Sequence, residues 1–143
     1  MAAASPTQVD NNLETFSLVW LDASVNSSQQ NVKAQQQLRT SINYLKTFEH
    51  VDKCEQYIRS VFKEDRIILI VSGRLGQEIV PRIHQLQQVS AIYVHCLSAD
   101  KKKYEQWAKN YAKVNEVFVF CLIGCILRFL GEKCRREIGR SRD

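Results

Sequence analysis

The feature that most restricts the fold of this 143-residue chain is a series of short apolar runs separated by amphipathic segments. The clearest run, residues 66–71 (RIILIV), is almost wholly apolar and rich in β-branched residues. A strand of this kind is typical of a parallel sheet that helices cover on both faces. Apolar runs at 16–22, 91–96 and 116–120 predict further strands. Residues 46–49 are too short for a helix and are expected to form the second strand along the chain.

The segments between these runs carry the periodicity of helices. Their apolar positions recur at helical spacing: Ala34, Leu38, Ile42 and Leu45; Cys54, Tyr57, Ile58 and Val61; Ile79, Ile83 and Leu86; and Tyr104, Trp107, Ala108 and Tyr111. Ser27 or Ser28 is suited to cap the first helix, and Asp52 with Glu55 resembles a capping box at the start of the second. Pro81 fits the third helix only within its first turn.

Strands that alternate with helices through short connections predict an α/β fold with a five-stranded, parallel, doubly wound sheet. With five strands, the flavodoxin-like order 2-1-3-4-5 is favoured. We expect a loose leader at 1–14, one α/β domain at 15–120, and a C-terminal segment at 121–143 that is first apolar and then basic. An apolar content of 45% argues against general disorder.

Composition excludes fewer classes of function than classes of fold. The net charge of +5 is mild and selects no class of partner, so no nucleic acid is expected. The five cysteines form no CxxC pair and follow no signal peptide, which indicates reduced thiols in a cytoplasmic setting. No histidine stands in an acidic or cysteine cluster at ligand spacing, so neither a metal nor a cofactor is predicted.

A ligand site in this topology lies at the carboxyl ends of the strands, where the strand order reverses. The residues that we expect there form a candidate anion-binding set: Asp22, Ser72, Gly73, Arg74, Gly76 and Ser98. The stretch from Ser72 to Gly76 matches neither GxGxxG nor GxxxxGK[ST]. It is either a plain turn with Arg74 in solvent, or an anion site in which glycines with positive φ and free amides at 76–78 assist Arg74.

No catalytic residue is predicted. Ser72 near His95 lacks the G-x-S-x-G context of a nucleophile, and a serine at a strand end usually bonds to backbone groups. His95 is interpreted as a histidine with satisfied hydrogen bonds at the end of a strand. Paired carboxylates for acid–base chemistry are missing from the pattern.

Several stretches of the chain resemble a known domain. Residues 15–115, with VWLD, LKTFEHVDKCEQYI and RIILIVSGRLGQEIVPRIHQL, resemble the receiver-like N-terminal domain of invertebrate multidomain proteins. In those proteins the domain commonly precedes an arginine ADP-ribosyltransferase module or tetratricopeptide repeats. The resemblance implies a receiver-like, flavodoxin-like fold, and it brings no assigned activity with it.

Receiver chemistry depends on groups that this chain lacks. Receivers hold Mg²⁺ with an acidic pair after the first strand, where Asp22 stands alone, and phosphorylate an aspartate after the third, where Ser72 stands. Ser98 is a loose match to their serine or threonine after the fourth strand, and their lysine after the fifth is replaced by 118–121 (FVFC). The resemblance therefore implies a pseudo-receiver, with the scaffold kept and phosphoryl transfer lost.

The leading hypothesis is a non-catalytic pseudo-receiver that serves as a signalling or protein-interaction module. We expect its protein partner to dock on the face that carries Lys101, Lys102, Lys103 and Lys109. One alternative is the N-terminal fragment of an NAD-dependent arginine ADP-ribosyltransferase, whose activity would lie downstream because the chain has no E-x-E motif. Another alternative is an anion- or nucleotide-binding sensor.

The C-terminal segment departs from the resemblance. Residues 117–131 (VFVFCLIGCILRFLG) are nearly unbroken apolar sequence, shorter than the ~20 residues that span a bilayer. The first interpretation is a strand followed by an atypical apolar helix, 122–130, that closes the edge of the sheet. The others are membrane association through 117–131, or an aberrant terminus that replaces a longer chain.

Overall fold

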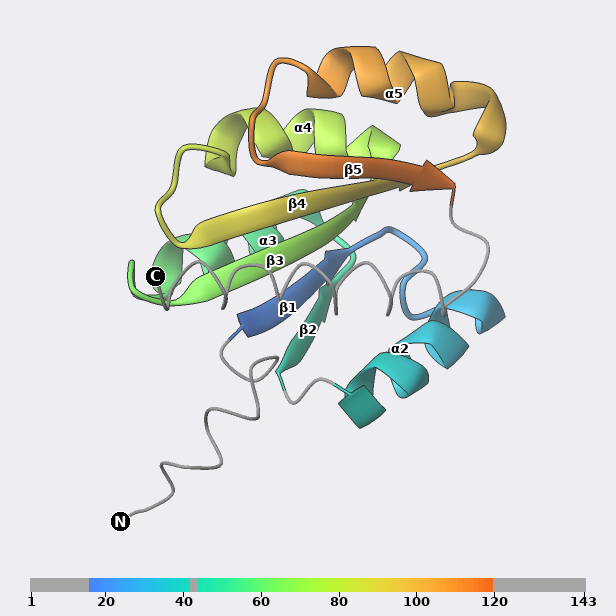
Figure 1. The fold of residues 1–143 in the computed structure, drawn as a ribbon. Helices are drawn as coiled ribbons and strands as arrows, with labels where there is room; N and C mark the ends of the chain where they lie inside the picture. Colours follow the sequence, from blue (N-terminus) through green and yellow to red (C-terminus); the bar gives the residue numbers. More distant parts are fainter. Residues whose placement is uncertain (1–15, 42–43, 120–143) are drawn as a thin grey trace.

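The computed structural model describes residues 16–41 and 44–119 (Figure 1). Its elements follow one another in this order: β1 (Phe16–Leu21), α2 (Gln29–Ser41), β2 (Leu45–Phe48), α3 (Val51–Ser60), β3 (Arg66–Ser72), α4 (Gly73–Ile83), β4 (Val89–Cys96), the 3₁₀ turn η2 (Ser98–Asp100), α5 (Lys101–Ala108) and β5 (Val114–Val119). All five strands are parallel, in the order β2-β1-β3-β4-β5. The predicted α/β class and flavodoxin-like strand order are confirmed.

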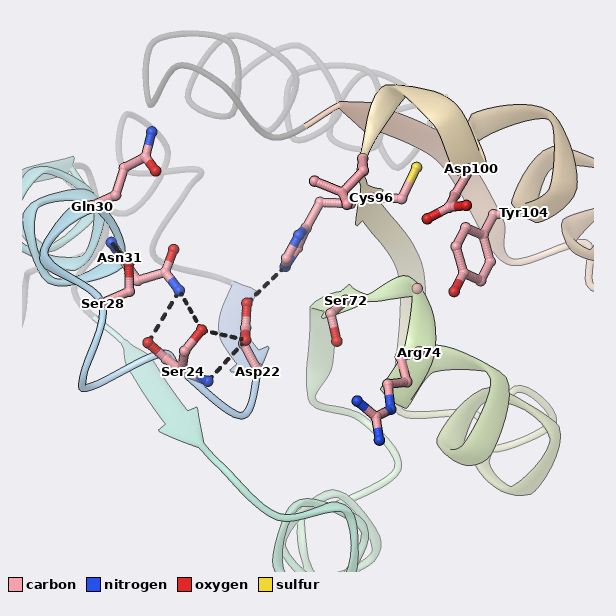
Figure 2. Close-up of a pocket in the computed structure, with 13 residues that line it drawn as sticks. Asp22, Ser24, Ser28, Gln30, Asn31, Ser72, Arg74, Cys96, Asp100 and Tyr104 are labelled. Atoms are coloured by element: carbon pink, nitrogen blue, oxygen red, sulfur yellow. Dashed lines mark hydrogen bonds and ion pairs between the residues drawn. The ribbon is translucent and has the colours of Figure 1, made fainter.

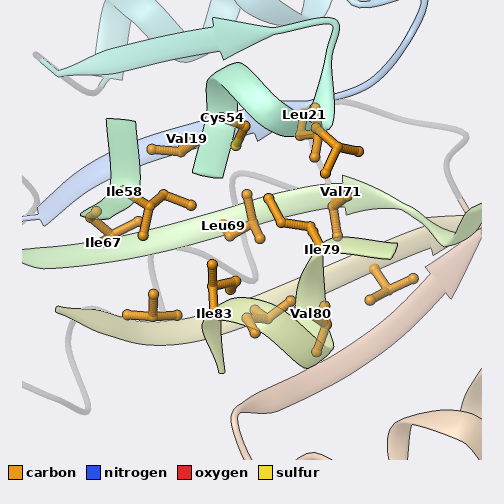
Figure 3. Packing of buried hydrophobic residues seen from close by; sticks show 14 of the residues in the cluster. Val19, Leu21, Cys54, Ile58, Ile67, Leu69, Val71, Ile79, Val80 and Ile83 are labelled. Carbon is orange, nitrogen blue, oxygen red and sulfur yellow. The ribbon is translucent and has the colours of Figure 1, made fainter. Parts of the chain in front are cut away.

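The central strands β3 and β4 are buried on both faces, to which successive side chains point in turn, whereas the edge strands β2 and β5 are partly exposed. On one side, α3 and α4 pack over β1, β3 and β4 (Figure 3); the residues they bury together include Val19, Leu21, Cys54, Ile58, Leu69, Val71, Ile79 and Ile83. On the other side, α2 adds Ala34 and Leu38 to a cluster with Trp20, Ile70, Tyr93 and Phe118. The continuous apolar run of β3 is therefore explained by burial from both sides.

The predicted helical stripes run past the ends of the helices at Leu45, Val61, Leu86 and Tyr111. Leu45 was assigned to the helical stripe, but it begins β2 and pairs with Leu18 of β1. It is 6% exposed, so an apolar residue was needed there for the sheet and not for the helix. Tyr111 was placed in the fourth helix, yet α5 ends at Ala108 and Tyr111 follows it, with its amide bonded to the carbonyl of Ala108 at 2.9 Å.

The capping box predicted at the start of α3 does not form. His50 occupies the N-cap position without a side-chain cap, and Asp52 instead lies 3.6 Å from Arg82. Glu55 accepts hydrogen bonds from Arg59 at 3.0 Å and from Arg82 of α4 at 3.2 Å. The acidic residues at this end of α3 thus connect α3 to α4.

Pro81 lies far from the first turn of α4, contrary to the prediction. The helix begins directly after β3, at Gly73, which places Pro81 inside it near its carboxyl end. Pro81 is exposed, so its ring faces solvent and not the sheet. The missing amide leaves the carbonyl of Gln77 without its helical hydrogen bond.

Gly73 and Gly76 serve close packing, and neither has the positive φ expected of a tight turn. A Cβ atom on Gly73 would lie 2.5 Å from ring atoms of Tyr104, which is 6% exposed. A Cβ atom on Gly76 would lie 3.2 Å from a methyl group of Val71. Glycine at 73 therefore lets the Tyr104 ring cover the start of α4.

The predictions for the leader (1–14), for Ile42 and for the C-terminal segment (121–143) lie outside the described residues. Within the described ranges, none of the helices has the length and apolar character needed to cross a membrane. Cys54 and Cys96 are both free thiols.

Candidate functional site

A polar cavity of about 390 Å³ lies at the carboxyl ends of β1, β3 and β4 (Figure 2). It is lined by Asp22, Ser24, Ser28, Gln30, Asn31, Ser72, Gly73, Arg74, His95, Cys96, Leu97, Asp100 and Tyr104. Strand order reverses between β1 and β3, so this is the position at which such sheets bind ligands. We call it the switch-point pocket.

An acid and a histidine meet at the floor of the pocket. Nε2 of His95 lies 3.1 Å from Oδ2 of Asp22, and Ser72 stands on the strand between them, in register with His95. The other carboxylate oxygen of Asp22 accepts bonds from the amide and the hydroxyl of Ser24, at 3.0 and 3.2 Å. Both oxygens of Asp22 are therefore engaged by the protein.

These bonds keep Asp22 ionised. Burial alone would raise the pKa of Asp22, but the hydrogen bond from His95 and those from Ser24 outweigh it and hold the pKa below its ordinary value of 3.8. The interpretation of His95 as a histidine satisfied at a strand end agrees with this contact. A carboxylate with both oxygens bonded in this way is poorly placed to hold a metal ion or to act as a nucleophile.

The N-terminal end of α2 forms one wall of the pocket. Ser28, one of the two predicted caps, caps the helix by accepting a bond from the amide of Asn31 at 3.3 Å. Asn31 is 6% exposed, and its Nδ2 donates to the backbone carbonyl of Ser24 at 3.1 Å. Gln35 fixes the same loop by donating to the carbonyl of Val25 at 2.7 Å. The buried carboxamides of Asn31 and Gln35 thus hold the β1–α2 loop to the helix.

The start of α4 forms the facing wall (Figure 2). Ser72 is its N-cap residue, and the serine hydroxyl makes no cap bond. Because the helix begins at Gly73, the amides without helical partners are those of Gly73, Arg74 and Leu75, and not those of 76–78 as predicted. Arg74 is exposed and forms no ion pair with the described residues.

The loop between β4 and α5 completes the pocket. Tyr104 and the exposed Leu97 provide apolar surface, and Asp100 provides a carboxylate. Burial raises the pKa of the Cys96 thiol, and the charge of Asp100 raises it further. Cys96 is thus a poor thiolate nucleophile at neutral pH.

The predicted anion-binding set is brought together in part. Asp22, Ser72, Gly73 and Arg74 line the pocket, whereas Gly76 packs against Val71 and Ser98 lies exposed in η2 outside it. The prediction missed Asn31, Asp100 and Tyr104. Asn31 lies three residues after Ser28, in the first turn of α2, and this position near a helix start was the signal available for it.

The predicted partner face lies on α5. Lys101, Lys102 and Lys103 form its first turn and are exposed, as is Lys109 at its carboxyl end. Lys101 pairs with Glu105 at 3.7 Å, and Lys103 lies 5.0 Å from the centre of the Tyr104 ring. Beside Lys109, a groove of about 250 Å³ runs between α5 and β5.

Fold and pocket together define a flavodoxin-like α/β protein with a polar site at the strand-order reversal. The described part of the chain contains no cluster of histidine, cysteine and acidic residues that could hold a metal ion. Compared with known proteins, the chain matches no family model, no curated protein and no solved structure at a significant level.

Proposed function

We propose that this chain is a non-catalytic pseudo-receiver, a signalling or interaction module that binds a protein partner through α5. The observation that carries the proposal is the row of three lysines, Lys101 to Lys103, in the first turn of α5. A helix favours negative charge at its N-terminal end, so positive charge there costs about 0.3–1 kcal/mol per residue. Natural proteins break one or two local rules of this kind at functional sites.

The pocket supports the non-catalytic half of the proposal. Ser72 stands where receivers carry the phosphorylated aspartate, and Asp22 is bonded to His95 and Ser24 on its two oxygens. A receiver needs the equivalent acid free to bind Mg²⁺. The scaffold of a signalling domain without these groups suits a module whose signal is an interaction.

A charge-reversed variant tests the partner face. Lys101, Lys102, Lys103 and Lys109 are changed together to glutamate, and the immobilised variant and wild type are used to capture proteins from extracts of the source cells. Glutamate suits the helix N-terminus at 101–103 and costs only about 0.3–1 kcal/mol at the exposed carboxyl end, so the variant should stay folded. The matched control carries the same change at exposed lysines on other elements: Lys33, Lys46, Lys53 and Lys63.

We expect the α5 variant to lose proteins that both the wild type and the control variant capture, and we expect high salt to release the same proteins. Capture of one and the same set by all three proteins would reject the α5 face as the docking surface.

A second candidate function is an anion-binding sensor, which the switch-point pocket favours. Arg74 lines the pocket without an ion pair, next to the free amides of Gly73 and Leu75. A ligand that binds only the folded state raises the melting temperature. Thermal unfolding with inorganic phosphate, acetate and nucleotides, in wild type and Arg74→Gln, tests this function, which is rejected if none of these anions shifts the wild-type transition.

A further inference from the structure

We infer that the switch-point pocket takes a small zwitterion, a molecule of the amino-acid class that carries both an anionic and a cationic group. The inference rests on the second candidate function and specifies its ligand. It starts from two opposite charges that line the same cavity without pairing. Arg74 and Asp100 both face the pocket, and neither forms an ion pair among the described residues.

The anionic end of the ligand belongs at α4. Arg74 supplies a guanidinium, and the start of the helix adds amides that have no helical partner. Ser72 adds a hydroxyl that makes no cap bond to the helix. A carboxylate can accept from all of these donors, and a bidentate bond to arginine fits its shape.

The cationic end belongs at Asp100. This residue is the N-cap of α5, and its side chain makes no cap bond there, so its carboxylate is available to the pocket. Asp22, the other acid of the pocket, is already bonded on its two oxygens. Of these two acids, Asp100 is thus the one left to receive an ammonium group.

A third observation comes from the opposite wall. Asn31 is 6% exposed, its Nδ2 donates to Ser24, and its Oδ1 accepts no hydrogen bond from a described residue. Figure 2 shows Asn31 across the pocket from Ser72 and Arg74. Asn31 lines the pocket, so this oxygen can accept a hydrogen bond from an ammonium or hydroxyl group of the ligand.

The size of the pocket agrees with a small ligand. Its volume of about 390 Å³ lies at the lower end of the range of roughly 300–1,000 Å³ for ligand sites. Tyr104 and Leu97 line one side with apolar surface, which suits the carbon skeleton between the two charges.

The test compares three kinds of probe in thermal unfolding and calorimetric titration of the full chain. Zwitterions are the standard α-amino acids and γ-aminobutyrate, the anions are acetate and inorganic phosphate, and the amine is ethanolamine. We expect one or more zwitterions to raise the melting temperature by more than acetate or phosphate does at the same concentration, and we expect ethanolamine to leave it unchanged.

Two variants remove one charge each. Arg74→Gln and Asp100→Asn should each weaken binding of the active zwitterion by about tenfold or more, the effect of losing one charge-assisted bond. Asparagine is as good an N-cap residue as aspartate, so Asp100→Asn should fold normally. Glu78→Gln, on the exposed side of α4 and outside the pocket, is the matched control and should bind like wild type.

The outcomes separate the two proposals. If acetate or phosphate binds as well as any zwitterion, and Asp100→Asn binds like wild type, the anion sensor stands and the zwitterion inference is overturned. Binding of ethanolamine alone would also overturn the inference. If no probe shifts the transition, both the sensor function and its ligand class fail.

Discussion

Asp22 is ionised although it is buried. Burial opposes ionisation of its carboxyl group, and hydrogen bonds to the carboxylate favour it. The carboxylate is 8% exposed as a residue, and its bonds to His95 and Ser24 lower its pKa below 3.8. The folded state thus binds fewer protons at this group than the unfolded state does in mildly acidic solution. Folding stability must then depend on pH through Asp22.

Replacing Asp22 by asparagine tests this dependence. The stabilisation from the carboxylate is fully present above about pH 3.8 and is lost as the pH falls through the lower pKa of the folded state. At pH 7 we expect Asp22→Asn to lower the free energy of unfolding by about 1–3 kcal/mol, the cost of a charged hydrogen bond. Urea unfolding from pH 7 to pH 3 should show the two proteins converging below pH 3.8, and a constant difference over that range would contradict the role of Asp22.

The contact of Gly73 with Tyr104 makes a second prediction for single residues. Gly73→Ala places a methyl group about where the ring now lies, at 2.5 Å, and should cost about 1–3 kcal/mol. In a Tyr104→Leu background the cost should largely vanish, because the ring atoms that clash are gone. Chemical unfolding of both single variants and of the double variant measures this coupling.

Gly76→Ala is the matched control for that cycle, since its nearest contact is 3.2 Å from a methyl group of Val71. It should cost less than Gly73→Ala and should not depend on Tyr104. Equal costs of Gly73→Ala with and without the Tyr104 ring would show that the close contact does not determine the choice of glycine.

At the level of the residue, the sequence predicts the pocket residues that stand at the strand ends. It does not predict the pocket residues that α2 and the β4–α5 loop contribute. Asp22, Ser72 and Arg74 were predictable because strand ends in a parallel sheet meet at one edge. The roles of Asn31 and Asp100 were not, because they depend on how α2 and the β4–α5 loop turn toward that edge. The place of His95 at a strand end was predictable, but its partner Asp22 was not.

Among the elements, α4 departs most from the ordinary rules of its type. Pro81 lies inside the helix and removes the bond to the carbonyl of Gln77. A proline in a helix interior costs about 3 kcal/mol relative to alanine, and its restriction of the unfolded chain offsets about 0.4–1 kcal/mol of that. The loss of helix stability is the larger of the two effects. It is smaller here than in the middle of a helix because Pro81 is close to the end of α4.

Pro81→Ala should therefore raise the free energy of unfolding by about 1–2 kcal/mol. Pro81 is exposed, so the substitution opens no cavity in the core. Thermal and urea unfolding measure the gain, with Gln77→Ala, also exposed on α4, as the control for a general effect of alanine. A variant that melts at or below the wild-type temperature would refute the cost assigned to this proline.

Element boundaries were predicted less well than the elements themselves. Leu45 continues the helical spacing of Ala34 and Leu38 and yet belongs to β2, because an edge strand with one buried residue in its first position resembles the last turn of a helix. The strands β3 and β4 were clear because both of their faces are buried, which leaves long apolar runs. Periodicity identifies an element best where its burial is most complete.

For the molecule as a whole, the two faces of the sheet differ in the helices that the described residues place on them. α3 and α4 pack on one face with Tyr104 of α5, while α2 is the helix that the described ranges provide for the other (Figure 1). On that second face Trp20, Tyr93 and Phe118 are nonetheless 0–7% exposed. The α/β class and the strand order could be predicted from the sequence. Which segments cover the α2 face of the sheet could not be predicted in the same way.

Deletion of residues 121–143 tests whether the apolar C-terminal segment is needed there. If it shields the α2 side of the sheet, the shortened protein should aggregate, bind hydrophobic dyes and lose its cooperative thermal transition, because buried aromatic side chains become exposed. Deletion of 133–143, which removes only the basic end, should leave the transition in place. A soluble and cooperatively melting 1–120 protein would contradict this expectation, and greater solubility than the full chain would favour the membrane alternative.

The contact between Asp22 and His95 also has a consequence for the order in which the protein folds. The pair joins the ends of β1 and β4, and β3 lies between these strands in the sheet. Its two partners meet only where β1, β3 and β4 are all in place, so we expect the contact to form late in assembly. Removing a contact made after the transition state speeds unfolding and leaves the folding rate nearly unchanged. We therefore expect loss of the acid–histidine pair to shorten the lifetime of the folded sheet and to have little effect on how quickly the sheet forms.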